Sequence, residues 1–278
     1  MNHLPENYSG AQTDEQLLNL WLNGRPESSQ KVYRPAAMSL LLELPNGLQQ
    51  ATVADVMRWA ASLNGAVATV AKKISAVKSL LTFSHRTGYT LFNVGLPLKA
   101  PTVPNKLHER IVEEPAVHSV IKEARQGRDK TLVRFLYATG ARISEVCRLR
   151  HKDISGCRIT LLGKGQKTRT VFVPSTIADE LRGLRLNNEA DEDFVFKSFR
   201  GRPLDPRNAR QIISLAADGA GLKMSPHWLR HAHASHALDN GAPIHLVSQC
   251  LGHANISTTS RYVHARPKDG SSTYLRLV

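Results

Sequence analysis

The sequence predicts an all-α domain over residues 1–96, joined by a linker at residues 97–106 to an α+β domain over residues 107–278. Three observations predict this division. A chain of 278 residues suits roughly two domains. Apolar residues recur at helical spacing before the linker, whereas short β-prone runs enter the pattern only after it. Between the two regions, prolines and basic residues interrupt any regular pattern.

Four helices are expected in the first domain. Thr13 and Gln16 have the spacing of a capping box ahead of a leucine-rich run. Thr52 can cap the third helix, and Gly88 can end the fourth in the left-handed conformation. The expected helices cover residues 13–22, 28–44, 52–63 and 67–86.

The linker is recognised by its prolines. Pro97, Pro101 and Pro104 stand among the basic residues Lys99 and Lys106. A basic stretch punctuated by proline is typical of a connection between domains. The boundary of the second domain is therefore placed near residue 107.

The second domain mixes both kinds of element. Helices are expected at residues 116–124, 130–138, from 143 onward, 207–217, 226–238, 244–250 and 258–264, and strands at 158–162, 168–173 and 194–197. The first two strands flank a glycine-rich turn, which predicts a hairpin. Helices around a small, mostly antiparallel sheet make an α+β domain.

Charge is distributed unevenly along the chain. The formal net charge is +14. Residues 1–100 contain nine Lys and Arg against six Asp and Glu, which leaves 28 against 17 for residues 101–278. A basic excess of this size favours a polyanionic partner, through release of counterions and long-range attraction. We therefore expect a nucleic acid as the partner.

The sequence favours a cytoplasmic protein. No run approaches the roughly 18 consecutive apolar residues of a membrane span, and the first residues lack a signal-peptide pattern. Cys147, Cys157 and Cys250 are odd in number and have no metal or redox spacing, which is typical of a reducing compartment. No membrane partner is expected.

Several short motifs in the second half occur in a distinctive order. They are Ala138-Thr139-Gly140-Ala141-Arg142-Ile143-Ser144-Glu145, then Gly163-Lys164-Gly165, His227-Trp228-Leu229-Arg230, Leu251-Gly252-His253, and finally Tyr262, nine positions beyond His253. In order, spacing and flanking residues the chain resembles the tyrosine recombinase (phage integrase) family, most closely its Xer-like members. The resemblance implies a SAM-like helical core-binding domain followed by a catalytic domain of the DNA breaking-rejoining fold.

The motifs supply residue types that phosphodiester transfer needs. Moving a DNA phosphate onto a side chain requires a nucleophile, cations for the non-bridging oxygens and a proton for the departing 5′-oxygen. The resemblance makes Tyr262 the nucleophile. Arg142 and Arg230 are expected to bracket the phosphate, because a guanidinium fork matches two phosphate oxygens. Glu145, one helical turn on, either orients Arg142 or pairs with a surface base.

Three further residues complete the expected site. The resemblance makes Lys164, in the hairpin turn, the general acid for the 5′-oxygen, with Lys167 and Arg169 as DNA-backbone contacts. His227 and His253 would hydrogen-bond the phosphate or accept the tyrosine proton, and the sequence does not say which is the base.

The fourth helix of the first domain carries a second group of cations. Lys72, Lys73, Lys78 and Arg86 lie along it. A solvated basic face is one interpretation; contact with DNA phosphates is the one preferred here.

A metal site is the chief alternative use of the histidines. His227 and His231 are four apart on an expected helix, with His233 and His236 nearby. Arg230 stands between the first two, and a cation there argues against a metal. No metal and no cofactor are expected, and His231, His233 and His236 are interpreted as packing or capping residues.

Two other functions remain to be weighed. A type IB topoisomerase has similar residues but usually lysine where His227 stands, and a DNA-binding module could have lost catalysis. The resemblance favours a recombinase that exchanges strands through a Holliday junction. It would act on double-stranded DNA with specific recombination sites, as a tetramer on two sites, homo-oligomeric or with a second recombinase. The extended segment 273–278 departs from the family's usual terminal helix and is expected to dock on a neighbouring subunit.

Overall fold

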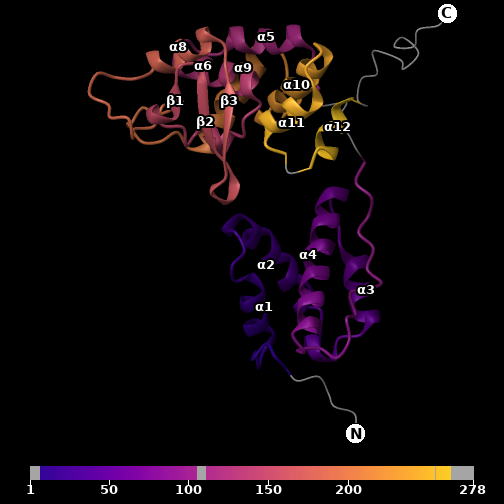
Figure 1. Cartoon of the computed structure of the whole chain (residues 1–278). Helices are drawn as coiled ribbons and strands as arrows, with labels where there is room; N and C mark the ends of the chain where they lie inside the picture. Colours follow the sequence, from indigo (N-terminus) through magenta and orange to yellow (C-terminus); the bar gives the residue numbers. More distant parts are fainter. Residues whose placement is uncertain (1–6, 105–110, 254, 264–278) are drawn as a thin grey trace, which may run out of the picture. The chain divides into compact units, whose positions relative to one another are not determined.

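The computed structural model describes residues 7–104, 111–253 and 255–263. The chain divides into two compact units, Met1–Pro104 and Asn105–Val278. Figure 1 shows both units with their elements labelled. The final segment, expected to dock on a neighbour, lies outside the described residues. Within the described residues, no helix has the length and apolar character that crossing a membrane requires.

The first unit is helical. Its helices are α1 (Asp14–Leu22), α2 (Glu27–Leu41), α3 (Val53–Ser62) and α4 (Val67–Arg86). Thr13 caps α1 by accepting from the backbone of Gln16, but the Gln16 side chain accepts from Gln12 instead of Thr13. The expected capping box is therefore wrong at α1, whereas Thr52 and Asp55 form a reciprocal one at α3.

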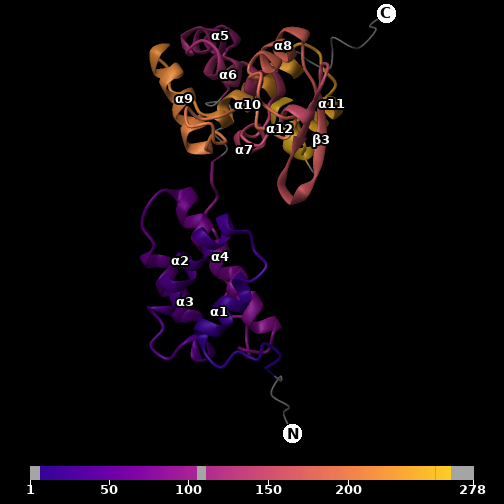
Figure 2. The ribbon, with the colours of Figure 1, turned by 90° about the vertical axis from the view of Figure 1, so that its left-hand side faces the viewer.

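The core of the first unit forms where α2 and α1 pack against α4. Trp59, Leu17, Leu40 and Leu80 are completely buried there. Burying such side chains contributes about 1.5–3 kcal/mol each. Figure 2 shows α1 to α4 of this unit from a second direction. Packing of this kind fixes which face of α4 remains exposed.

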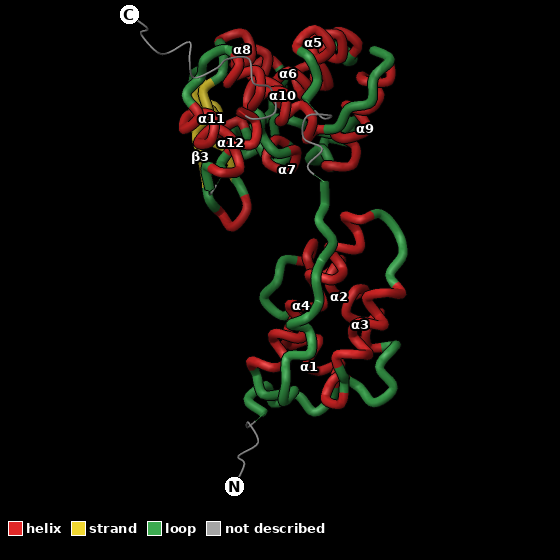
Figure 3. The backbone as a smooth tube through the Cα atoms, turned by 90° about the vertical axis from the view of Figure 1, so that its right-hand side faces the viewer, coloured by secondary structure: helices red, strands yellow, loops and turns green. Residues whose placement is uncertain are grey.

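The second unit places helices around a small sheet. The helices are α5 (Glu114–Glu123), α6 (Arg128–Thr139), α7 (Ile143–Val146), α8 (Ser175–Gly183), α9 (Pro206–Gly219), α10 (Pro226–Asp239), α11 (Ile244–Leu251) and α12 (Ser257–Val263). The strands β1 (Ile154–Ser155), β2 (Arg158–Leu162) and β3 (Thr168–Phe172) form an antiparallel sheet in that order. In Figure 3 the strands lie beside α11, which packs against β3.

Two elements differ from those expected. No helix was expected at α8, although Ile177, Ala178 and Leu181 are buried at helical spacing. The predicted strand at 194–197 is wrong, since this segment makes only the isolated bridges Arg150↔Phe194 and Lys197↔Pro203. Side-chain pattern alone does not distinguish one bridge from a continuous ladder.

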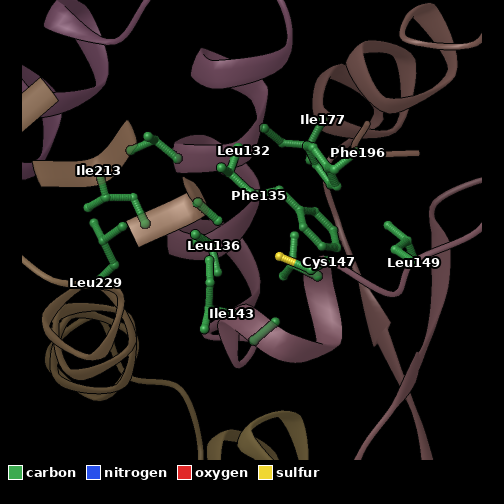
Figure 4. Packing of buried hydrophobic residues seen from close by; sticks show 14 of the residues in the cluster. Leu132, Phe135, Leu136, Ile143, Cys147, Leu149, Ile177, Phe196, Ile213 and Leu229 are labelled. Carbon is green, nitrogen blue, oxygen red and sulfur yellow. The ribbon is translucent and has the colours of Figure 1, made fainter. Parts of the chain in front are cut away.

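The core of the second unit is built around α6. Leu132, Phe135 and Leu136 are buried on this helix, and Figure 4 shows them facing Phe196 and Ile213. The Phe135 and Phe196 rings lie 6.3 Å apart between centroids. Helix α10 packs against α6 and also contacts α11 and α12. The core therefore holds in place the helices that carry the functional motifs.

Candidate active site

Arg142 lies where α6 gives way to α7. Its backbone N–H donates to Oε2 of Glu145 at 2.8 Å, and its Nη1 donates to Oε1 at 2.9 Å. The Glu145 side chain is only 2% exposed, whereas that of Arg142 is 39% exposed. Of the two expected roles for Glu145, the geometry favours orienting Arg142, whose guanidinium retains an accessible surface.

Arg230 of α10 is buried between two turns of the chain. Its Nη1 donates to the carbonyl of Gly140 at 2.6 Å and its Nη2 to the carbonyl of Leu251 at 2.8 Å. Burial, with the charges of Arg142 and Arg169, lowers the pKa of Arg230 to about 10. Arg230 is still a cation at neutral pH. Two of its five N–H groups are used by these carbonyls, so the guanidinium is oriented before any ligand arrives.

Gly140 makes this arrangement possible. It ends α6 in the left-handed conformation, with φ of 58°. A Cβ atom there would lie 2.6 Å from Leu251 Cδ2 and 2.7 Å from His233 Cδ2. Any other residue would be strained and would push α10 and α11 away. The glycine in the Thr-Gly-Ala-Arg motif therefore lets Arg230 approach the segment that carries Arg142.

His253 follows α11, and the positive charges of Arg230 and Arg142 act on it. Burial, together with the charges of Arg230 and Arg142, lowers its pKa to about 4. Its Nδ1 lies 2.8 Å from Oγ1 of Thr259, a buried residue of α12. The imidazole is therefore neutral near pH 7 and has the capacity to accept a proton. Thr259 was not among the expected site residues.

Tyr262 is buried on α12. It is 5% exposed and packs in a small apolar cluster with Ala234, Val247 and Leu251. Its hydroxyl lies 2.7 Å from Nδ1 of His231, which is hydrogen-bond distance. When ionised, Tyr262 raises the pKa of Arg230. The expected nucleophile thus lies near the arginines with its hydroxyl already bonded within the protein.

The histidines of α10 have different surroundings. His233 Nδ1 lies 2.8 Å from the Tyr137 carbonyl oxygen, and His236 Nδ1 lies 2.8 Å from the Tyr137 hydroxyl. These two pack α10 against α6, in agreement with their interpretation as packing residues. His231 instead contacts Tyr262, a role that sequence spacing did not reveal. His227 is exposed in the first turn of α10.

The hairpin turn contains the expected general acid. Lys164–Gln166 forms a short 3-10 turn between β2 and β3, with Gly165 at φ of 73°. The Gly163 N–H donates to the Lys167 carbonyl at 2.8 Å, which closes the turn. The Lys164 side chain lies outside the described residues, and Lys167 is exposed. The backbone therefore places Lys164 at the tip of the hairpin.

Arg169 does not occupy the surface position expected of a DNA contact. Its side chain is 12% exposed and forms an ion pair with Glu145 at 2.6 Å. Its Nε donates to the Cys250 carbonyl at 2.8 Å. A guanidinium held on both edges by the protein has little surface left for a phosphate. Arg169 is therefore not interpreted as a contact with the DNA backbone. Its side chain instead links β3 to Glu145 and to the end of α11.

The basic side chains of α4 that are expected to contact DNA are exposed or half-buried. Lys72 and Arg86 are exposed, whereas Lys73 and Lys78 are half-buried. The Lys78 ammonium donates to the carbonyl of Leu98. Lys78 and Arg86 line a surface pocket of about 320 Å³. The structure thus gathers two of the four expected DNA contacts around one hollow.

The residues described offer little to a metal ion. Among residues 7–104, 111–253 and 255–263, no cluster of three or more His, Cys, Asp or Glu side chains is arranged to hold one. Burial raises the pKa of the Cys147 thiol to about 11. Cys147 lies in the core with α6 and α7, so it is a packing residue there.

Comparison with known sequences identifies the family. The model of the Phage integrase family matches residues 109–269. The tyrosine recombinase XerC of Bacillus licheniformis is 36% identical over 225 residues, covering 74% of this chain and 73% of the relative. The tyrosine recombinase XerC of Mycobacterium tuberculosis is 34% identical over 266 residues, covering 87% of this chain and 89% of the relative.

Solved structures share the fold. The XerH site-specific recombinase bound to palindromic difH substrate superposes with a TM-score of 0.73 at 20% identity, covering 91% of this chain and 82% of that one. A lambda integrase dimer bound to a COC′ core site gives 0.75 at 15% identity, covering 93% and 96%. These likenesses confirm the expected two-part architecture.

The match of the family model covers more than half of the chain, and the identity to the XerC relatives exceeds 30% over most of both proteins. Two of the motifs quoted from the sequence, those that contain Gly140 and Leu251, are hydrogen-bonded to Arg230 of a third. The chain therefore belongs to the phage integrase family of tyrosine recombinases, enzymes that break and rejoin DNA, and is Xer-like within it.

Proposed function

We propose that this chain is a site-specific DNA recombinase in which Tyr262 forms a covalent 3′-phosphotyrosyl intermediate. The observation that carries the proposal is that Arg230 is hydrogen-bonded to the segments that carry Arg142 and His253, while His253 Nδ1 lies 2.8 Å from Thr259 on the same helix as the buried Tyr262. Cations, a proton acceptor and a hydroxyl are the groups that phosphoryl transfer to a side chain requires.

The chemistry divides among these residues. Arg142 and Arg230 bind the non-bridging oxygens and stabilise the charge that grows in the transition state. The Tyr262 oxygen loses its proton and forms a bond to phosphorus while the bond from phosphorus to the 5′-oxygen breaks. Lys164 donates a proton to that oxygen. In the reverse direction a 5′-hydroxyl attacks the phosphotyrosyl bond, so rejoining needs no external energy source.

Proton acceptance is best assigned to His253. The lowered pKa of His253, due to burial and the charges of Arg230 and Arg142, keeps it neutral at physiological pH. His227 is exposed at the start of α10, three residues before Arg230 on the same helix. We assign His227 to a hydrogen bond with the phosphate. This division is our proposal for the alternative that the sequence left open.

Tyr262 must leave its resting contact before it reacts. Its hydroxyl lies at hydrogen-bond distance from His231, and the ring is 5% exposed. Attack on a duplex phosphate therefore requires α12 to shift when DNA binds. A hydrogen bond of this kind contributes about 0.5–1.5 kcal/mol, which contacts with DNA can readily exceed.

The first unit is proposed to bind the core of the DNA site. Lys72, Lys73, Lys78 and Arg86 on α4 would contact phosphates. The two XerC relatives are bacterial, and bacterial DNA lies in the cytoplasm, so we place the protein there.

Strand exchange is proposed to take place in a tetramer on two DNA sites. A lambda integrase tetramer bound to a Holliday junction shares the fold, with a TM-score of 0.74. The protomers would be identical or paired with a second recombinase. Deleting residues 271–278 is expected to weaken assembly and spare DNA binding, as measured by ultracentrifugation with and without DNA. Unchanged assembly would exclude this role for the tail.

A suicide-substrate assay tests the function. Genomic fragments bound by the protein are recovered, nicked near candidate sites and incubated with wild type or Tyr262→Phe. We expect a covalent adduct with wild type alone, and strand exchange when a second site is added. Adducts with DNA relaxation but no exchange would favour a topoisomerase, and binding without any adduct would favour an inactive DNA-binding module.

A further inference from the structure

A buried ion pair lies at the centre of the second unit's polar network. Nη1 and Nη2 of Arg169 donate to Oε1 and Oε2 of Glu145 at 2.6 and 2.7 Å. The side chains are 12% and 2% exposed. Burial alone would raise the pKa of Glu145, but hydrogen bonds and charge from Arg169, with the Arg142 backbone N–H, outweigh it and lower the pKa. The carboxylate is therefore ionised.

This pair connects elements that are far apart in sequence. Arg169 lies on β3, opposite Leu161 of β2, and Glu145 belongs to α7. The Nε of Arg169 donates to the Cys250 carbonyl near the end of α11. One guanidinium thus joins the hairpin, α7 and α11.

Two glycines show how closely neighbouring segments approach the pair. Gly252, in the left-handed conformation with φ of +64°, would place a Cβ atom 3.0 Å from Cδ of Arg169. A Cβ atom on Gly163 would lie 3.1 Å from the Lys167 carbonyl oxygen and 3.4 Å from Oε1 of Glu145. Each glycine directly precedes a residue of the proposed site, His253 or Lys164. The pair therefore lies against both segments.

Three of the proposed site's segments thus converge on one contact. Arg142 donates twice to Glu145, Lys164 follows a glycine packed near Glu145, and His253 follows a glycine packed on Arg169. A planar guanidinium fork fixes such a geometry, whereas an ammonium group presents no matching pair of parallel donors. Removing one partner would also leave an unpaired buried charge.

We propose that Arg169 is a positioning residue of the recombination reaction, which holds the hairpin, α7 and the end of α11 in register so that Lys164, Arg142 and His253 meet the same phosphate. The proposal rests on the proposed function. It assigns Arg169 no contact with DNA. A displacement of about 1 Å at a reacting centre costs roughly 100-fold in rate.

The test compares Arg169→Lys with Arg158→Lys. Arg158 lies on β2 of the same hairpin and is exposed, so it controls for loss of a guanidinium as such. Two suicide substrates are used, one with the natural 5′-oxygen leaving group and one with sulfur at that position. A thiol has a pKa of about 8.5, so sulfur leaves without a proton donor. DNA affinity is measured by fluorescence anisotropy.

Arg169→Lys should bind DNA within about twofold of wild type but cleave the oxygen substrate about 100-fold more slowly at saturating DNA. On the sulfur substrate the deficit should shrink about tenfold or more, because general acid catalysis is then no longer needed. Arg158→Lys should match wild type on both. The wild-type protein alone tests the proposed function. If wild type forms no adduct, the proposed function is rejected, and this inference is not the cause.

Either of two outcomes overturns the inference. Weakened affinity with an unchanged rate at saturation would make Arg169 a DNA contact, and an equal deficit on both substrates would show that Arg169 does not position Lys164. If Arg169→Lys does not fold, as judged by thermal melting, Glu145→Gln combined with Arg169→Met removes both buried charges together. The same results are expected of that double variant.

Discussion

Basic side chains in the two units differ in burial and in hydrogen bonding. In the second unit Arg169 and Arg230 are buried, and each donates to protein carbonyls or a carboxylate. In the first unit Lys72 and Arg86 are exposed on α4. Cations that stabilise a transition state must be oriented beforehand, whereas cations that attract a polymer work while solvated. Burial therefore distinguishes Arg230, proposed for chemistry, from Lys72 and Arg86, proposed for binding.

The largest expected effect comes from replacing Arg230, a buried cation that the protein holds in one orientation. Arg230→Lys keeps a positive charge but cannot bond both the Gly140 and Leu251 carbonyls while facing a phosphate. Cleavage of a suicide substrate should fall about 100- to 1000-fold, with DNA affinity almost unchanged. If affinity fell in parallel with the rate, Arg230 would belong with the binding cations and the contrast would fail.

The opposite behaviour is expected on α4. Replacing Lys72 and Lys73 by Gln should weaken DNA binding roughly tenfold and lower the slope of log affinity against log salt by about two. The cleavage rate at saturating DNA should stay the same. Lys31→Gln is the matched control, because Lys31 is an exposed lysine of the same unit that is paired with Glu27. A salt slope that did not change would remove these lysines from the DNA interface.

A smaller effect is expected from removing the hydrogen bond between Tyr262 and His231. His231→Leu removes the hydrogen-bond partner of Tyr262, so the energy needed to release the hydroxyl decreases. Cleavage should become about fivefold faster, which corresponds to one hydrogen bond of about 1 kcal/mol. Rapid-quench measurements of the first turnover would detect it. Slower cleavage would mean that His231 assists the reaction.

The smallest effect is expected in the way thermal stability depends on pH. Burial lowers the pKa of His233 to about 4, and burial with the charges of Arg230 and Arg142 lowers that of His253 to about 4. Both lie below the unfolded value of about 6.5, so folding favours the neutral rings. Their contribution is present above pH 6.5 and is lost as pH falls toward 4.

The melting temperature should therefore fall by several degrees between pH 6.5 and 4, and His233→Asn should flatten this dependence. His245→Asn, at an exposed position of α11, should leave it unchanged. Calorimetric scans at several pH values would measure both. An equally steep fall in His233→Asn would assign the effect to other groups.

Local patterns predicted most of the helices. The limits of α4 agree with the expected 67–86, because a long apolar repeat ends at Gly88, which has the left-handed φ of 72° expected of a helix end. The segment 194–197 was wrongly expected to be a strand, since its bridges to Arg150 and Pro203 depend on tertiary packing. Helix α8 was missed although its buried residues repeat at helical spacing.

The sequence proposed the members of the site but not the contacts between them. Arg142, Arg230, His253 and Tyr262 stand in recognisable motifs. The contact of Tyr262 with His231 depends on how α12 packs against α10, which no motif spacing encodes. Arg169 was misinterpreted although one signal was present. It lies two positions from Val171, which is buried on β3, so strand alternation already directs Arg169 inward.

The most direct test of the account is to locate the covalent bond. Wild-type protein is trapped on a nicked DNA site, digested with nuclease and protease, and analysed by mass spectrometry for a peptide that carries a nucleotide. We expect a single modified residue, Tyr262, joined to a 3′-phosphate. A nucleotide on another residue, or a 5′-phosphate linkage, would exclude transfer of the arginine-bound phosphate to Tyr262.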